Sequence, residues 1–193
     1  MWTSFALFTL VSALTPGPGN LLMLASGLNM GARNTLPLVL GVHAGFVGML
    51  VLAGLGVGAA VQGVPCLEQA MIVAGAAYLL WLAWKLAHVA PGAGMPGADA
   101  RLGFWQGLLL QAFNPKAWMA SLMVGGLYLQ GREPLGFAAV ILVFLLLSLP
   151  CSLAWVMGGA MFAGVRAHPG RLVAVNRILA ATLVASAILV LMA

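Results

Sequence analysis

The chain has 193 residues, of which 63% are hydrophobic and 6% are charged, and its mean hydropathy is +1.10. Soluble domains carry about 25% charged residues, so this composition excludes an ordinary soluble fold and indicates an integral membrane protein. The formal charge of +5 comes from basic residues scattered singly along the chain, a pattern that disfavours nucleic-acid binding and is typical of membrane-topology signals.

Six apolar stretches are long enough to cross a bilayer, since a helical span needs about 20 residues. They cover residues 2–25, 36–61, 67–89, 104–127, 135–160 and 172–192. The first stretch lacks a basic flank and is too long for the apolar core of a signal peptide, so we interpret it as a retained span. The predicted fold class is an all-α integral membrane protein with six transmembrane helices in a single domain, 1–193.

Basic residues are divided unevenly between the loops. Those in or beside the loops after the first, third and fifth spans are Arg33, Lys85, Arg101, Arg166 and Arg171. The loops after the second and fourth spans offer only Arg132, which is next to Glu133. The positive-inside rule places the first set in the cytoplasm. With six spans, both termini are then external.

A segment rich in glycine and proline, residues 91–100, is predicted to be a linker. It divides the chain into halves, about 1–90 and 101–193, with three spans each. An odd number of spans reverses orientation, so a duplication here gives an inverted repeat of the kind found in transporters. In both halves the first span is interrupted by proline next to asparagine. We therefore predict two inverted three-helix repeats with broken first helices.

The two interruptions are the candidate binding site. Their residues are Pro16, Gly17, Pro18, Gly19 and Asn20 in the first span, and Asn114, Pro115 and Lys116 in the fourth. Proline removes a backbone donor and leaves carbonyls unpaired, which a membrane protein tolerates only beside protein or a water-filled cavity. Half-helix N-termini suit a carboxylate, and the freed carbonyls suit an ammonium group.

Lys116 is the only charged residue that falls well inside a predicted span. A buried cation needs a partner, and no Asp or Glu falls well inside a span, because Glu68, Asp99 and Glu133 lie near span ends or in loops. The partner is therefore a helix carbonyl, water or an anionic ligand, and we interpret Lys116 as a receptor for a substrate carboxylate. The alternative is that its side chain extends to the membrane interface.

His43 is the only histidine well within a predicted span. Its ordinary pKa of about 6.5 suits proton coupling, and a hydrogen-bonded structural role is the alternative. Cys66 and Cys151 lack metal-ligand or redox spacing, so neither a metal site nor a cofactor is predicted.

Several motifs carry a family resemblance over essentially the whole chain. They are Thr15–Pro18 in the first span, Gly41 and Gly45 in the second, Gly75–Leu79 leading to Trp84 in the third, and Phe104–Gly107 followed by Asn114–Lys116 in the fourth. In these motifs the chain resembles the LysE/RhtB family of amino-acid exporters. The resemblance implies a six-helix inner-membrane protein that moves amino acids or close derivatives outward, driven by the proton-motive force.

One departure from the family concerns the residue after Pro-Gly-Pro, which is often Asn or Asp but here is Gly19, with Asn20 following. An acidic side chain for a substrate ammonium is therefore missing, which disfavours strongly cationic substrates such as lysine.

The predicted function is thus a bacterial inner-membrane secondary transporter, not an enzyme. Its expected partners are an amino acid, protons, the lipid bilayer and further copies of the chain, since glycine-rich helix faces allow association. One alternative is a membrane thiol-redox carrier that uses Cys66 and Cys151; another is a purely structural or interaction role.

Overall fold

The computed structural model describes residues 2–56, 65–89, 102–129 and 133–192, and all regular elements in them are helical. The predicted linker 91–100 and the topology signals Arg101 and Arg132 lie outside these residues. The helices are α1 Trp2–Leu14, α2 Pro18–Met30, α3 Ala32–Gly54, α5 Pro65–Ala87, α6 Phe104–Ala112, α7 Pro115–Val124, the π-helical turn η2 Gly125–Leu129, α8 Pro134–Met161, α9 Ala163–Arg166 and α10 Pro169–Met192.

The helical membrane class predicted from the sequence is confirmed. Four segments in the described part of the chain are long and apolar enough to cross a membrane: α3, residues Gln69–Ala87 of α5, α8 and α10. Helices α1 and α2 pass the same test only as a pair, and they are bent by 52° where they meet. In the predicted fourth span, α6, α7 and η2 follow one another as separate short pieces.

The predicted boundary between the first two spans was wrong. The sequence suggested a loop between residues 25 and 36, but α2 continues to Met30 and α3 begins at Ala32. Gly31 alone makes the turn, with φ of 77°, which glycine adopts without strain. Asn29 donates to the carbonyl of Ala25 one turn earlier in α2, at 2.7 Å, and Asn34 of α3 donates to the carbonyl of Met30, the last residue of α2, at 3.0 Å.

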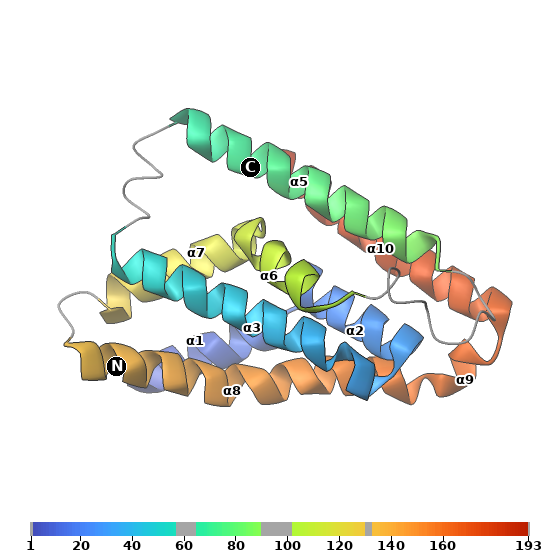
Figure 1. Cartoon of the computed structure of the whole chain (residues 1–193), viewed down its shortest axis with the longest axis horizontal. Coiled ribbons are helices and arrows are strands. Elements are labelled where there is room, and N and C mark those ends of the chain that lie inside the picture. Colours follow the sequence, from blue (N-terminus) through green and yellow to red (C-terminus); the bar gives the residue numbers. More distant parts are fainter. Residues whose placement is uncertain (1, 57–64, 90–101, 130–132, 193) are drawn as a thin grey trace.

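The helices form a bundle in which α5 and α10 pack side by side along one edge, and α8 runs along the opposite edge (Figure 1). The shorter helices of the two broken regions, together with α3, lie between these edges (Figure 1). The most extensive remaining contacts join α3 to α6 and α2 to α8. Each broken region is therefore held against a long continuous helix.

Glycines allow two of these helix pairs to approach closely. A Cβ atom on Gly41 of α3 would overlap the carbonyl oxygen of Phe104 on α6, and one on Gly45 would lie 2.9 Å from Cβ of Gln111. In the same way, a Cβ on Gly27 of α2 would overlap the carbonyl oxygen of Val156 on α8. Small residues at crossings are how membrane helices gain packing contacts, so the glycine-rich second span has the packing role that the sequence indicated.

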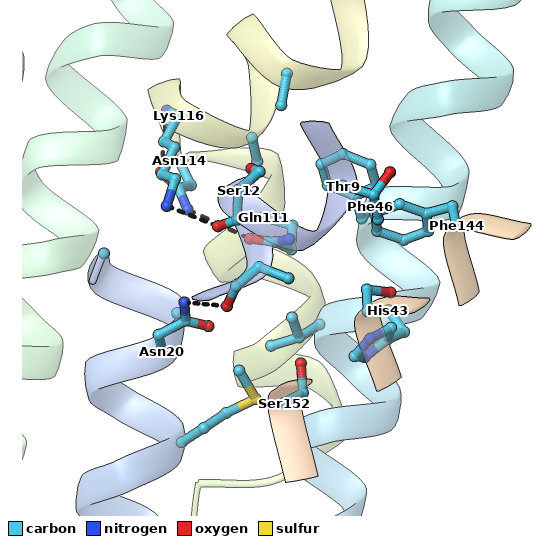
Figure 2. A pocket seen from close by; sticks show the side chains of 18 of the residues that line it. Thr9, Ser12, Asn20, His43, Phe46, Gln111, Asn114, Lys116, Phe144 and Ser152 are labelled. Atoms are coloured by element: carbon cyan, nitrogen blue, oxygen red, sulfur yellow. Dashed lines mark hydrogen bonds between the residues drawn. The ribbon is translucent and has the colours of Figure 1, made fainter. Parts of the chain in front are cut away.

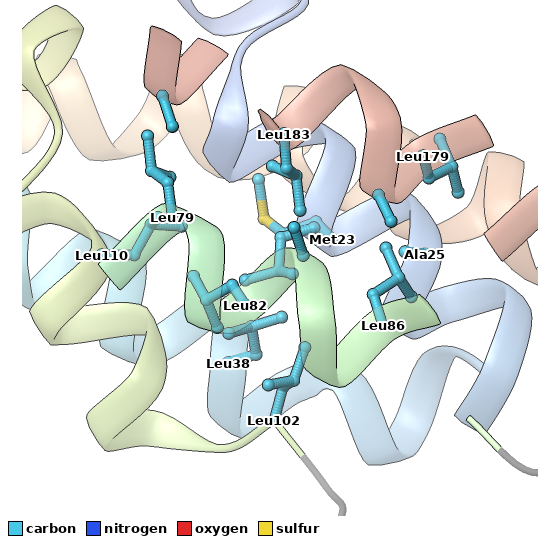
Figure 3. Close-up of a cluster of buried hydrophobic side chains, with 14 of the residues drawn as sticks. Met23, Ala25, Leu38, Leu79, Leu82, Leu86, Leu102, Leu110, Leu179 and Leu183 are labelled. Atoms are coloured by element: carbon cyan, nitrogen blue, oxygen red, sulfur yellow. The ribbon is translucent and has the colours of Figure 1, made fainter. Parts of the chain in front are cut away.

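Two apolar clusters make up the core. The larger joins α2, α5, α6 and α10 with the start of α3 through buried leucines around Met23 (Figure 3). The smaller lies between α1, α3, α7 and α8 and contains Phe5, Phe46, Leu50 and Val140. Met23 of the larger cluster and Phe46 of the smaller one both face the same cavity. The cavity therefore lies where the two clusters meet.

Candidate functional site

The first break leaves the C-terminal carbonyls of α1 without helical partners, because residues 16 and 18 are prolines and have no N–H. Side chains from other segments supply the missing donors. Lys116 Nζ donates to the carbonyls of Ser12 and Thr15, both at 3.0 Å. Asn20 Nδ2 donates to those of Ala13 and Thr15, at 2.8 and 2.9 Å. The negative end of the α1 dipole thus faces an ammonium and an amide.

The second break is organised by Asn114, which precedes α7. Its Oδ1 accepts from the backbone N–H of Lys116 at 3.1 Å, an N-cap bond. Its Nδ2 donates to Gln111 Oε1 at 3.3 Å. Because Lys116 follows Pro115 in the first turn of α7, this cap fixes the helix that carries the ammonium group.

At each break, a tryptophan indole donates a hydrogen bond to a backbone carbonyl near the end of the interrupted helix. Trp155 Nε1 of α8 donates to the carbonyl of Ala13 at 3.2 Å, near the end of α1. Trp118 Nε1 of α7 donates to the carbonyl of Ala112 at 2.7 Å, at the end of α6. An indole has one donor and no acceptor, so it suits an exposed helix carbonyl. Both freed helix ends are satisfied inside the protein.

A cavity of about 90 Å³ lies between the two breaks and is bounded by α1, α2, α3, α6, α7 and α8 (Figure 2). This space holds several waters or one small solute. Its polar lining consists of Thr9, Ser12, Asn20, His43, Gln111, Asn114, Lys116, Ser148 and Ser152. Among the described lining residues none is Asp or Glu, so Lys116 gives this cavity a positive charge.

Three polar atoms in the lining have no hydrogen-bond partner. They are Thr9 Oγ1, His43 Nε2 and Ser148 Oγ, and no other buried side-chain nitrogen or oxygen in the described ranges lacks one. Unpartnered buried polar atoms are rare and call for an explanation, such as a bound water or ligand. These three therefore mark the part of the cavity that is prepared for polar contacts.

The protonation of neutral His43 follows from its surroundings. Nδ1 lies 2.9 Å from the carbonyl oxygen of Val39, which can only accept, so Nδ1 carries the proton. Nε2 is then a bare acceptor. The backbone carbonyl of Ser148 lies near the imidazole, but Nε2 makes no hydrogen bond of standard geometry. One nitrogen of His43 is thus hydrogen-bonded structurally, as the alternative predicted, and the other faces the cavity without a partner; proton coupling by His43 stays a prediction.

Most of the residues predicted for the site meet in this cavity. Gly17, Gly19, Asn20, Asn114 and Lys116 all line it, although 94 or more positions separate the two motifs in sequence. His43 lines it from α3. The prolines act through the backbone: Pro16 lies between α1 and α2, while Pro18 and Pro115 are the first residues of α2 and α7.

Sequence reasoning missed several lining residues, namely Thr9, Ser12, Gln111, Ser148 and Ser152. Isolated Ser, Thr and Gln are ordinary in membrane helices, where most of them bond to their own backbone. The available signal was position, because Ser12 and Gln111 lie one turn before a break. Ser148 and Ser152 flank Pro150 in α8.

The cysteines do not support the redox alternative. Both are free; Cys66 is exposed at the start of α5, while Cys151 is buried in α8. The Cys151 thiol donates to the carbonyl of Leu147 at 3.3 Å. The described residues also contain no group of three or more His, Cys, Asp or Glu that could hold a metal.

Long apolar helices around a cavity that polar side chains line in part, with two broken helices at its wall, define this protein as a polytopic membrane transporter. The chain belongs to the LysE type translocator family, whose sequence model matches residues 10–193. The family predicted from the sequence motifs is thereby confirmed.

Similar curated proteins carry the name cysteine/O-acetylserine efflux protein. The one from Klebsiella pneumoniae is 31% identical over 188 residues, covering 96% of this chain and 94% of the relative. The one from Salmonella typhimurium is 33% identical over 189 residues, covering 96% and 95%. The one from Escherichia coli is 37% identical over 116 residues, covering 59% and 58%. No solved structure matches the chain.

Proposed function

We propose that this protein exports a small neutral amino acid or a close derivative, of the cysteine and O-acetylserine class for which its relatives are named. The observation that carries the proposal is the arrangement of Lys116 and the α1 carbonyls at one cavity. A zwitterion needs a cation for its carboxylate and acceptors for its ammonium, and this wall offers both.

Lys116 retains a donor for a substrate carboxylate. An ammonium group has three N–H bonds, and those to Ser12 and Thr15 account for two. The third is available to a carboxylate in the cavity. Each backbone carbonyl has two lone pairs. Among the described side chains, only that of Lys116 donates to the carbonyl of Ser12, so this carbonyl can accept a second hydrogen bond. The substrate ammonium would share this end of α1 with Lys116.

The lack of acidic side chains among the described lining residues of the cavity supports a substrate without a net charge. A second positive charge on the substrate would meet Lys116 and, among the described lining residues, no acidic side chain. An uncompensated charge in a site of low dielectric costs several kcal/mol. Cationic amino acids are therefore expected to be poor substrates.

We also propose six spans, with α1 and α2 as one broken span and α6, α7 and η2 as another. The helix contacts support an inverted repeat. Helices α1 and α2 of the first half pack on α8, and α6 and α7 of the second half pack on α3. The third spans of the two halves, α5 and α10, pack on each other. This reciprocal pattern suits alternating access, in which the two halves rock around a shared site.

Proton coupling is proposed to use His43, because Nε2 has no protein partner and lies in the substrate cavity. A titratable group inside the substrate site lets proton and substrate binding influence each other. The inner-membrane location, the external termini and the association of several copies of the chain remain predictions from the sequence.

The test is efflux from proteoliposomes that contain the purified protein. We expect cysteine or O-acetylserine loaded inside to leave faster than from protein-free vesicles, and lysine to leave no faster. An imposed proton gradient should accelerate export in the wild type and not in His43→Gln. Vesicles with verified protein that release no member of a broad amino-acid panel faster than controls would refute the proposed function.

A further inference from the structure

We infer that Thr9, His43 and Ser148 form a subsite that binds a polar group in the side chain of the exported amino acid. The inference rests on the proposed export function and concerns the same cavity. It adds which residues select the substrate, and by what chemistry.

The three residues share two properties. Each is buried, with 2%, 5% and 4% of its surface exposed, and each has a polar atom without a hydrogen-bond partner. They come from three different helices, α1, α3 and α8, yet all three line one cavity. Leaving a buried polar atom unpaired is unfavourable, so three of them converging on one space indicates a ligand contact in the working protein.

The subsite lies across the cavity from the charged end. Figure 2 shows Lys116, Asn114 and Asn20 on one side, and Thr9 and His43 with Phe46 and Phe144 on the other. The Ser148 backbone lies near the imidazole of His43, which places Ser148 on the second side. An amino acid whose carboxylate is held by Lys116 would therefore direct its side chain toward these residues.

The atoms of the subsite suit a short polar side chain. Both hydroxyls can donate to an ester carbonyl or to the sulfur of a thiol, and a bare Nε2 can accept from a thiol. Phe46 and Phe144 stack with ring centroids 4.3 Å apart and form an apolar wall beside them. An aliphatic side chain of the same size would fit that wall but would leave the polar atoms unpaired. Sites of this type reject analogues that lack the hydrogen-bonding group.

The discriminating substrate pair is cysteine and 2-aminobutyrate, in which a methyl group replaces the thiol. Their transport efficiency, kcat/KM, is measured with the full-length protein in proteoliposomes. We expect the wild type to favour cysteine by about tenfold. Thr9→Val and Ser148→Ala, tested singly, should each reduce this preference by about three- to tenfold, mainly through slower cysteine transport.

Thr35→Val is the matched control. It makes the same chemical change at a buried threonine of α3 that lies outside the cavity lining. Its hydroxyl donates to the carbonyl of Gly31 at 2.9 Å, so the control perturbs the helix but not the subsite. The cysteine preference of this variant should equal that of the wild type.

The outcomes separate the two proposals. Failure of the wild type to transport any amino acid refutes the proposed function itself. Equal transport of cysteine and 2-aminobutyrate by the wild type leaves export standing and overturns the subsite, without requiring any variant to fold. An unchanged preference in both folded variants overturns it as well, because neither hydroxyl would then contact the side chain of the substrate.

Discussion

Lys116 Nζ lies 3.0 Å from the carbonyl oxygen of Ser12, although 104 positions separate the two residues. The hydrogen bond links the broken helix of one half of the chain to that of the other. A cation at the carbonyl end of α1 is favourable because the helix dipole is negative there. The charge that Lys116 brings into the protein is thus offset by the carbonyls that the first break exposes.

Replacing Lys116 should separate its proposed role in binding the substrate carboxylate from its role as a hydrogen-bond donor to the α1 carbonyls. Lys116→Gln keeps a donor for the α1 carbonyls but removes the charge, whereas Lys116→Met removes both. We expect both variants to lose at least tenfold in transport, because neither can hold a carboxylate by charge. Only Lys116→Met should also lose about 2 kcal/mol of stability, since a charge-assisted hydrogen bond is worth about 1.5–3 kcal/mol.

Efflux assays and thermal unfolding in detergent measure these two effects, with membrane levels checked for each variant. Full transport by Lys116→Gln would remove the carboxylate role. Full stability of Lys116→Met would show that the α1 carbonyls do not depend on the ammonium.

Asn20 provides a second test of the first break. Its amide donates to two carbonyls, those of Ala13 and Thr15. Asn20→Leu removes both donors at similar volume and should destabilise the protein by about 1–3 kcal/mol. Asn20→Asp should be worse, because a carboxylate has only acceptors and would face two carbonyl oxygens. Thermal unfolding of the two variants gives the ranking, and a more stable Asn20→Asp would contradict this account.

The sequence predicted the two breaks because proline removes a backbone donor from a helix, although a single proline does not always end one, since Pro37 and Pro150 lie inside α3 and α8. Helix α1 ends at Leu14, just before the first motif, and α7 begins at Pro115 with Asn114 as its N-cap. The ammonium of Lys116 has one of the three predicted kinds of partner, a helix carbonyl. Which of the three it would be depended on the packing of α7 against α1, and no local pattern specifies that.

Some lining residues could not be predicted from the sequence because what distinguishes them is a hydrogen bond that they do not make. Thr9 and Thr35 are equally ordinary in the sequence, and both are buried threonines in helices. Thr35 donates to Gly31 and also lies 3.1 Å from Ser26 Oγ, whereas Thr9 Oγ1 has no partner. Only the three-dimensional arrangement distinguishes them. The single-residue turn at Gly31 escaped prediction for a related reason, since the asparagines on either side of it are paired by tertiary packing: Asn29 bonds Asn176 of α10, and Asn34 of α3 bonds Met30 of α2.

Two glycines of α3 should respond differently to the same substitution. A Cβ on Gly41 would overlap the Phe104 carbonyl, whereas one on Gly48 would have no neighbour within 4 Å. Gly41→Ala should therefore force α3 and α6 apart and cost about 1–3 kcal/mol. Gly48→Ala should be neutral or stabilising by up to about 1 kcal/mol, because alanine favours a helix. The melting temperatures of the two variants test this difference. Equal melting temperatures would mean that α3 and α6 are not tightly packed where they cross.

Because the buried hydroxyl of Thr9 has no hydrogen-bond partner, we expect its removal to stabilise the protein. Thr9→Val removes a buried polar atom that has no partner, so the substrate-free protein should melt at a higher temperature than the wild type. Thr35→Val breaks existing hydrogen bonds and should lower the melting temperature, by an amount that corresponds to about 1 kcal/mol. A fall for Thr9→Val as large as that for Thr35→Val would indicate that its hydroxyl has a stabilising partner, such as a fixed water.

The orientation of the chain can be tested with its own cysteines. Cys66 is exposed at the start of α5, which the positive-inside rule places on the external side, and Cys151 is buried within α8. In right-side-out vesicles, a membrane-impermeant maleimide should label the wild type and Cys151→Ser, but not Cys66→Ser. Serine retains a donor for the Leu147 carbonyl that the Cys151 thiol contacts, so Cys151→Ser should still fold and transport. Labelling of Cys66 only in inside-out vesicles would reverse the proposed topology.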